Sequence, residues 1–227
     1  MLIEQYISLS GIDVTQVPDQ FYRQIDTYQQ ALANEKEAST DQLKWQYQVP
    51  ELGEGGSCSL FDQLAAQPYD LEPILGGKTE LTTALLARVT AIVDFYQKNS
   101  GSQWFGVYQK RINPQGETVL VKLAYYGAAS RAEFPLTPEF AAMSNNSTVG
   151  LSGKARIIND VGVYLSAGGE YYTCDPKVQS EACLPLFAED RRLVGIIDSE
   201  AFAKNVFVEK ELSLLLSVAV KLGAILS

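Results

Sequence analysis

Two short apolar runs near the C-terminus, joined by a charged turn, are the feature that most constrains the fold. The runs are Ala182–Phe187 and Leu193–Asp198, and Ala188–Arg192 lies between them. Apolar runs separated by a polar loop of this length predict two neighbouring antiparallel strands. We therefore expect a sheet that includes this buried pair.

Further strands are expected upstream. Trp104–Tyr108 has the composition of a strand, and a turn at Asn113–Gly116 leads into a second strand from Thr118 to Tyr126. The turn residues between two such segments are typical of a β-hairpin. A short strand is also predicted at Arg156–Ile158.

One helix is expected before these strands and another after them. Thr79 is expected to open a helix that ends near Asn99, and Leu81 lies on the stripe that should face the sheet. A last helix is predicted from about Glu209, with leucines at three- and four-residue steps. Helices that flank a mainly antiparallel sheet define an α+β fold.

The N-terminal part is expected to form a helical extension. Gln20–Glu37 places apolar residues on one helical face, as an amphipathic helix does. A breaker cluster at Gly53–Gly56 and a second glycine pair at Gly76–Gly77 then interrupt the chain. We therefore predict an N-terminal helical extension over residues 1–77 and a second domain over residues 78–227.

Composition narrows the possible partners. The chain has 27 acidic and 18 basic residues, a net charge of −9, and no clustered basic face, which argues against nucleic acid as a partner. No stretch approaches the roughly 20 apolar residues that span a bilayer, and the N-terminus lacks a basic leader. We therefore expect a cytoplasmic protein that does not enter membranes and that binds a small molecule.

The residue inventory also limits the chemistry. The chain contains no histidine, which excludes Cys-His and Ser-His nucleophile pairs and histidine-based zinc sites. Three cysteines, Cys58, Cys174 and Cys183, are too few for a disulfide framework and lack the paired spacing of a metal site. No metal ion is expected, and acid-base work falls to carboxyl groups, Tyr, Lys or a thiol.

The segment from Cys174 to Glu181 is the strongest candidate for a reactive site. It places the Cys174 thiol beside the carboxylate of Asp175, and Glu181 follows at the start of the predicted strand. Loops that lead into buried strands often carry functional groups. Cys183 lies within the apolar run itself and is expected to be an inert core residue.

Three motifs in the last two thirds of the chain follow one another in a familiar order. They are Trp104-Phe105-Gly106-Val107-Tyr108, Cys174-Asp175 with Ser180-Glu181, and Gly195-Ile196-Ile197-Asp198-Ser199-Glu200-Ala201. Together with the order of helices and strands, they resemble a GAF domain, and within that fold the free methionine-(R)-sulfoxide reductases. The resemblance implies a GAF-like central antiparallel sheet and a reductase activity toward a free amino acid.

The resemblance also implies a role for each matching residue. Cys174 would be the nucleophile, with Asp198 and Glu181 as further catalytic residues. The substrate-binding residues would be Trp104, Tyr108, Glu181, Asp198 and Glu200. The family commonly has further cysteines where this chain has Ser152 and Ser130, so Cys58 is the candidate resolving thiol.

The chemistry is consistent with these residue types. Reduction of a sulfoxide needs a thiol that attacks sulfur and an acid that protonates the oxygen, and a second thiol must then clear the sulfenic acid. Carboxyl groups that share a pocket raise one another's pKa, which keeps an acid available. The expected reductant is an external thiol, thioredoxin or a small thiol, without a bound cofactor.

Two other functions remain open. The absence of the usual resolving cysteines favours a non-catalytic GAF module that binds an amino-acid-like ligand as a sensor or regulatory domain. The helices at the N-terminus and from Thr79 are compatible with a dimerising domain, and a homodimer is therefore a further expectation.

Overall fold

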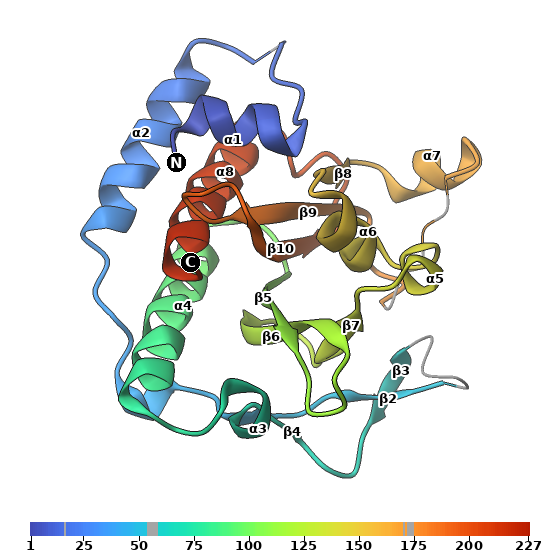
Figure 1. Cartoon of the computed structure of the whole chain (residues 1–227). Helices are drawn as coiled ribbons and strands as arrows, with labels where there is room; N and C mark the ends of the chain where they lie inside the picture. The colour runs from blue at the N-terminus through green and yellow to red at the C-terminus, as the bar shows by residue number, and fades with distance from the viewer. Residues whose placement is uncertain (16, 54–58, 170, 172–174) are drawn as a thin grey trace.

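A six-stranded antiparallel sheet forms the centre of the molecule in the computed structural model (Figure 1). The structure describes residues 1–15, 17–53, 59–169, 171 and 175–227, with the backbone alone at residue 61. The strand order is β7-β6-β5-β10-β9-β8. The strands are β5 (Trp104–Ile112), β6 (Thr118–Tyr126), β7 (Glu133–Pro135), β8 (Arg156–Ile158), β9 (Ser180–Phe187) and β10 (Leu193–Ala201). Both expected strand pairs, β5 with β6 and β9 with β10, are confirmed.

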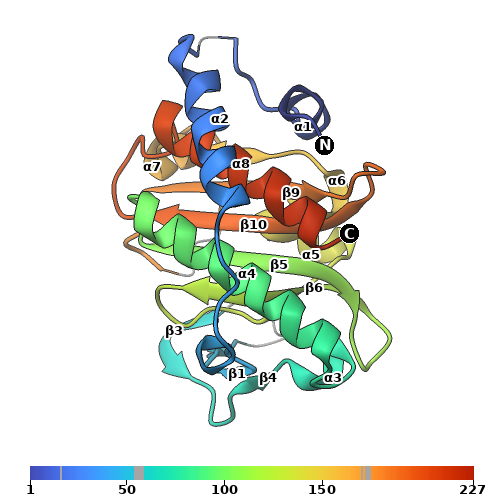
Figure 2. The same ribbon diagram turned by 90° about the vertical axis from the view of Figure 1, so that its left-hand side faces the viewer.

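Helices α4 (Glu80–Asn99) and α8 (Glu209–Ile225) lie side by side across one face of this sheet (Figure 2). Alternate strand residues, among them Phe105 and Ile197, belong to the core that these helices share with the sheet. The ring of Phe105 stacks on Tyr96 of α4 at a centroid distance of 4.1 Å. The α+β class predicted from the sequence is therefore confirmed.

Helix α4 begins and ends where its sequence signals place it. Thr79 caps the helix by accepting a hydrogen bond from the backbone N–H of Thr82, and the last helical residue is Asn99. The expectation that Leu81 faces the sheet is wrong, since its side chain is 83% exposed. The buried residues of α4 begin only at Leu86, because the first turn of the helix extends beyond the part that packs on the sheet.

The first 77 residues share the main hydrophobic core. Helix α2 (Gln20–Ala33) packs its buried Phe21 and Ile25 face on α8, and α1 (Ile3–Ser10) also contacts α8. The boundary after residue 77 stays a prediction, since core residues on both sides of it form one cluster.

This part of the chain is not wholly helical. After α2 and the short helix η1 (Thr40–Gln42), it contains β1 (Gln46–Tyr47), β2 (Pro50–Leu52), β3 (Ser59–Leu64), β4 (Tyr69–Asp70) and the helical turn α3 (Glu72–Leu75). Strands β1 and β4 pair with each other, as do β2 and β3. The expectation of a helical extension is corrected here: part of the segment is extended, because its strands pair with one another, and Tyr47 ties it to the central sheet by donating a hydrogen bond from its hydroxyl to the Lys122 carbonyl on β6.

The opposite face of the sheet carries α5 (Pro138–Ala141) and α6 (Asn145–Ser152), and α7 (Val161–Ser166) follows β8 (Figure 1). Helix α6 contacts β9 and β10. Gly150 of α6 lies so close to Leu120 and Leu136 that an added Cβ would come within 2.8 Å of both side chains. This close packing fixes α6 above the sheet and positions the first turn of α6 at the cavity described below.

Candidate functional site

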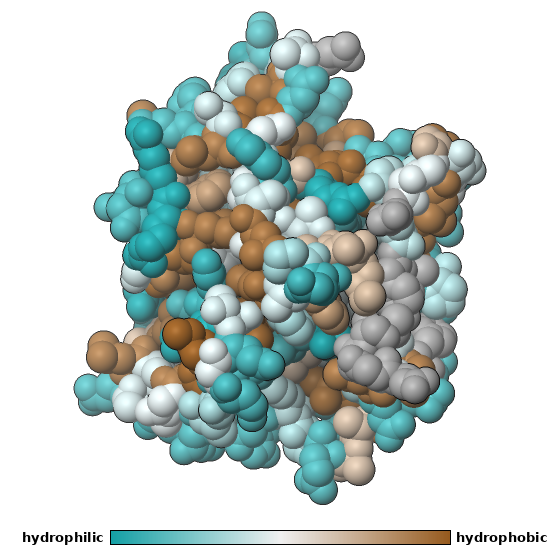
Figure 3. Space-filling model, turned by 45° about the vertical axis from the view of Figure 1, so that its right-hand side comes forward, coloured by the Kyte–Doolittle hydropathy of each residue, from teal (hydrophilic) through white to brown (hydrophobic). Residues whose placement is uncertain are grey.

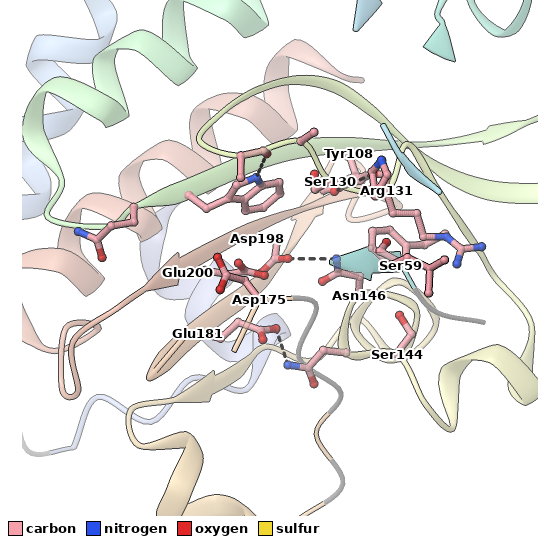
Figure 4. A pocket seen from close by; sticks show the side chains of 18 of the residues that line it. Ser59, Tyr108, Ser130, Arg131, Ser144, Asn146, Asp175, Glu181, Asp198 and Glu200 are labelled. Atoms are coloured by element: carbon pink, nitrogen blue, oxygen red, sulfur yellow. Dashed lines mark hydrogen bonds between the residues drawn. The ribbon is translucent and has the colours of Figure 1, made fainter. Parts of the chain in front are cut away.

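A cavity of about 190 Å³ lies on the sheet face opposite α4 and α8. Its floor is formed by β5, β9 and β10, and its walls by the start of α6, the 128–131 loop and β3 (Figure 4). Polar and apolar residues are intermixed on this side of the molecular surface (Figure 3). The cavity brings together five of the residues predicted from the sequence, namely Trp104, Tyr108, Glu181, Asp198 and Glu200.

The strand register explains why three carboxyl groups meet here. Glu200 on β10 lies directly opposite Glu181 on β9, and Asp198 lies opposite Cys183. Because strand residues alternate between faces, Asp198 and Glu200 share the cavity side. A pair of like charges placed directly across two strands is destabilising, so the sheet alone does not account for this arrangement.

Two asparagines at the start of α6 hold these carboxyl groups. Asn145 donates from Nδ2 to Glu181 Oε1 at 2.6 Å, and Asn146 donates from Nδ2 to Asp198 Oδ2 at 3.1 Å (Figure 4). Ser144 caps the helix just before them by accepting the N–H of Ser147. Sequence reasoning did not assign either asparagine to the site. The signal available was a serine N-cap followed by two amides, which places both on the first turn of a helix.

Burial makes all three carboxyl groups harder to ionise. It raises the pKa of Glu181 and, with the added repulsion of Glu181 and Glu200, raises the pKa of Asp198 well above its ordinary value. The pKa of Glu200 is raised to about 8, first by burial and then by the charges of Glu181 and Asp175. The cavity therefore holds a protonated carboxyl group near neutral pH, which can serve as an acid.

Several polar atoms around these groups have no hydrogen-bond partner among the described residues. They include Asp198 Oδ1, Asn145 Oδ1 and Asn146 Oδ1, all of them buried acceptors. A buried acceptor without a donor costs about 1–3 kcal/mol. A ligand with a group that carries several N–H donors, such as an ammonium, would satisfy them.

Trp104 and Tyr108 form an aromatic wall of the cavity. Their rings lie 6.5 Å apart between centroids, and Trp104 donates from Nε1 to the Ala128 carbonyl at 3.0 Å. Gly106 lies between them on β5, and a Cβ at this position would come within 2.4 Å of the indole. The glycine is needed because the indole lies across the strand backbone at this point.

Among the described residues, the free cysteine is Cys183, and its burial does not suit a reactive thiol. Cys183 is fully buried, and burial, reinforced by the charges of Asp198 and Glu181, raises the pKa of its thiol well above the ordinary value. The sequence expectation that it is a core residue agrees with this burial. Cys174 and Cys58 both lie outside the described residues, although Asp175 and Ser59, which follow them in the chain, line the cavity.

Ser130 and Ser152, the two serines singled out in the sequence, differ in their surroundings. Ser130 lines the cavity and accepts a hydrogen bond from Lys122 Nζ at 2.6 Å, whereas Ser152 is exposed at the end of α6. Lys122 is itself fully buried and has its ammonium 4.0 Å from the centroid of the Tyr125 ring. Lys122 therefore holds the 128–131 loop, which forms the wall of the cavity beside Trp104.

Within the described part of the chain, no group of His, Cys, Asp and Glu side chains is arranged to hold a metal ion. Among the same residues, no helix combines the length and apolar character needed to cross a bilayer.

The raised pKa of Glu200 predicts that the stability of the ligand-free protein depends on pH. The carboxyl has a pKa of about 8 in the folded state against 4.5 when unperturbed, so the unfolded state loses this proton first as the pH rises. The free energy of unfolding should therefore fall between pH 4.5 and 8. We expect the melting temperature, followed by circular dichroism, to rise when the pH is lowered from 8 to 6.

The variant Glu200→Gln removes this titrating group and should weaken the dependence, part of which remains because burial also raises the pKa of Glu181 and Asp198. A melting temperature that increases toward pH 8 in the unaltered protein would contradict the assignment.

Comparison with solved structures identifies the fold. A type II free methionine-R-sulfoxide reductase from Thermoplasma acidophilum matches with a TM-score of 0.53 and 21% identity, over 65% of this chain and 95% of that chain. A free methionine-R-sulfoxide reductase from Neisseria meningitidis, solved in complex with its substrate, matches with a TM-score of 0.50 and 18% identity, over 67% and 86% of the two chains. The expected fold is therefore confirmed as GAF-like, and it resembles that of the free methionine-R-sulfoxide reductases.

A third match extends over nearly the whole molecule. A protein from Burkholderia vietnamiensis described as a GAF sensor matches with a TM-score of 0.53 and 15% identity, over 93% of this chain and 92% of that chain. This coverage includes most of the first 77 residues. No family model matches the chain, and no curated protein matches it in sequence.

Proposed function

We propose that the protein binds free methionine (R)-sulfoxide in this cavity and reduces it with Cys174 as the nucleophile. The observation that carries the proposal is the convergence of three carboxyl groups on one cavity: those of Glu181 and Asp198 are buried, and that of Glu200 is partly exposed. None of them forms an ion pair with a described Lys or Arg side chain. Buried carboxylates need such a partner, and the ammonium of a free amino acid would supply it.

The aromatic wall of the cavity is suited to the side chain of methionine sulfoxide. Trp104 and Tyr108 offer aromatic surface to the S-methyl group, since sulfur and aromatic rings make favourable contacts. A peptide-bound residue has no ammonium at its Cα, so the acidic floor favours the free amino acid. The fold neighbours that act on or bind this substrate support the same choice.

The reaction that we propose balances as follows. The Cys174 sulfur attacks the sulfoxide sulfur while a protonated carboxyl, assigned to Asp198 or Glu181, donates its proton to the oxygen. In the adduct so formed, the oxygen moves from the substrate sulfur to the Cys174 sulfur: a Cys174 S–O bond forms, the bond between the two sulfur atoms and the original S–O bond both break, and methionine leaves. The product is the Cys174 sulfenic acid, and the proton of the Cys174 thiol passes to the carboxylate that gave up its own. A first thiol then forms a disulfide with Cys174 and releases water, and a second thiol reduces that disulfide.

Reduction of the Cys174 sulfenic acid is the step in which this protein would differ from the free methionine-(R)-sulfoxide reductases. Ser152 and Ser130 stand where resolving cysteines are common, so Cys58 or an external thiol must provide the first thiol. We propose thioredoxin or a small thiol as the final reductant, with no bound cofactor. The homodimer and the cytoplasmic location stay predictions.

The proposal is tested by incubating the protein with an equal mixture of the (R) and (S) sulfur epimers of L-methionine sulfoxide and excess dithiothreitol. We expect free methionine to accumulate until about half of the sulfoxide is consumed, because only the (R) epimer reacts. Chromatography of the amino acids after derivatisation measures both compounds. Full consumption of the mixture would contradict the stereochemical part of the proposal.

A second candidate function is a non-catalytic module that binds the same class of ligand. It is favoured by the two serines at the usual cysteine positions and by the likeness to the Burkholderia protein over most of the chain. Its expected result is an increase in melting temperature with L-methionine or its sulfoxide, without methionine formation with dithiothreitol or thioredoxin.

A further inference from the structure

The N-terminal segment contributes directly to the cavity wall. Strand β3 places Ser59, Leu60 and Gln63 among the lining residues, opposite the floor formed by β5 and β10 (Figure 4). Strand β2 supports it through the pairs Pro50 with Leu64 and Leu52 with Ser59. A ligand in the cavity is therefore in reach of side chains from both parts of the protein.

Ser59 differs from the other serines of the cavity in its hydrogen bonding. Its side chain is 8% exposed, and among the described residues nothing pairs with its Oγ. Ser144 is used as the cap of α6, and Ser130 accepts from Lys122. A buried hydroxyl without a partner costs free energy, so its position at a cavity indicates a partner that arrives with the ligand.

The chemistry of the other unpartnered atoms indicates what Ser59 binds. Asp198 Oδ1, Asn145 Oδ1 and Asn146 Oδ1 are acceptors and require N–H donors from the ligand. The Ser59 hydroxyl is a donor as well as an acceptor, and it comes from β3, whereas Glu181 and Glu200 come from β9 and β10 on the floor of the cavity (Figure 4). An amino acid held by its ammonium at the acidic side still has oxygen atoms that need a donor.

We propose that the Ser59 hydroxyl donates a hydrogen bond to an oxygen atom of the bound ligand, so that the N-terminal segment takes part in recognition. This inference rests on the proposed binding of a free amino acid. The oxygen belongs either to the carboxylate or to the sulfoxide. Both are strong acceptors, and the choice of probe separates them.

The experiment measures binding by isothermal titration calorimetry in the Cys174→Ser background, where no turnover depletes the ligand. The probes are L-methionine sulfoxide and L-methionine. Ser59→Ala should weaken binding of the sulfoxide about 3- to 10-fold, the effect of one lost hydrogen bond. An equal loss with methionine identifies the carboxylate, and a loss confined to the sulfoxide identifies the sulfoxide oxygen.

Two further variants separate recognition from structure. Ser59→Thr keeps the hydroxyl on a strand residue and should restore binding, whereas Ser39→Ala changes an exposed serine of the same segment and should leave binding unchanged. The melting temperature of Ser59→Ala should not decrease, because the variant removes an unpartnered buried hydroxyl.

Unchanged affinity of Ser59→Ala for both probes, in a protein that binds them, overturns this inference and leaves the proposed function standing. Absence of binding to the Cys174→Ser protein with intact Ser59 overturns both.

Discussion

Replacement of Cys174 by serine is expected to abolish methionine formation, with a loss of at least about 1,000-fold in turnover. A serine hydroxyl is almost entirely protonated near neutral pH and cannot form the sulfenic acid through which the oxygen is transferred. The measurement is the initial rate of methionine release from L-methionine (R)-sulfoxide with dithiothreitol. Ligand binding should persist, because the residues proposed to hold the amino acid are unchanged.

Cys183 provides the matched control for this experiment. It lies on β9 beneath the cavity, is fully buried, and has a thiol whose pKa is raised by burial. Cys183→Ala removes the thiol without burying a new polar group and should keep turnover within about 3-fold, at a modest cost in stability. Turnover that survives in Cys174→Ser, or that disappears in a folded Cys183→Ala protein, would assign the nucleophile elsewhere.

The strand pairs β5–β6 and β9–β10 and the helices α4 and α8 were predictable because each has a strong local signal, whereas the short elements β7, α5, α6 and α7 were not predicted. The charged turn between β9 and β10 and the Thr79 cap of α4 are short-range features, and both define boundaries within a few residues. The face of α4 was less predictable. Its apolar residues permit more than one stripe, and only packing on the sheet decides that Leu86 is buried and Leu81 exposed.

The strands of the N-terminal segment carried a signal that the prediction of a helical extension overlooked. Trp45, Tyr47 and Val49 alternate with polar residues, the period of a half-buried strand. Strand β1 spans only Gln46–Tyr47, however; it pairs with β4, and the Tyr47 hydroxyl donates a hydrogen bond to the Lys122 carbonyl on β6. Short strands of this kind depend on tertiary structure, which a single sequence does not display.

The site was predictable where spacing along one strand determines it. Asp198 and Glu200 are two residues apart on β10, so they share a face in any register. Their meeting with Asn146 and Ser59 depends on how α6 and β3 pack above the sheet, and no local pattern encodes that geometry. The residues contributed by loops and by the N-terminal segment were therefore missed.

The second large effect is expected for Asp198→Asn, which should change binding and stability in opposite directions. Asn146 donates to Asp198 Oδ2, and an amide oxygen at this position can still accept that bond. The other carboxyl oxygen, Oδ1, would become an NH₂ group, which cannot accept from the ligand ammonium. Loss of one charge-assisted hydrogen bond should weaken binding of L-methionine sulfoxide about 10- to 100-fold.

The ligand-free protein should gain stability from the same substitution. Burial and the charges of Glu181 and Glu200 raise the pKa of Asp198, so a neutral side chain removes a buried group that is costly to ionise. We expect about 1 kcal/mol of added stability at pH 8, measured by urea denaturation, with a smaller gain at pH 6 where the carboxyl groups are more fully protonated.

Asp190→Asn is the matched control, because Asp190 lies exposed in the turn between β9 and β10 and pairs with Arg192. It should leave both affinity and stability nearly unchanged, as exposed ion pairs contribute little. If Asp198→Asn lowered stability and affinity together, the carboxyl would be a structural group of the sheet. Lower affinity together with higher stability is expected only if the buried Asp198 carboxyl destabilises the ligand-free protein and is stabilised by the bound ligand.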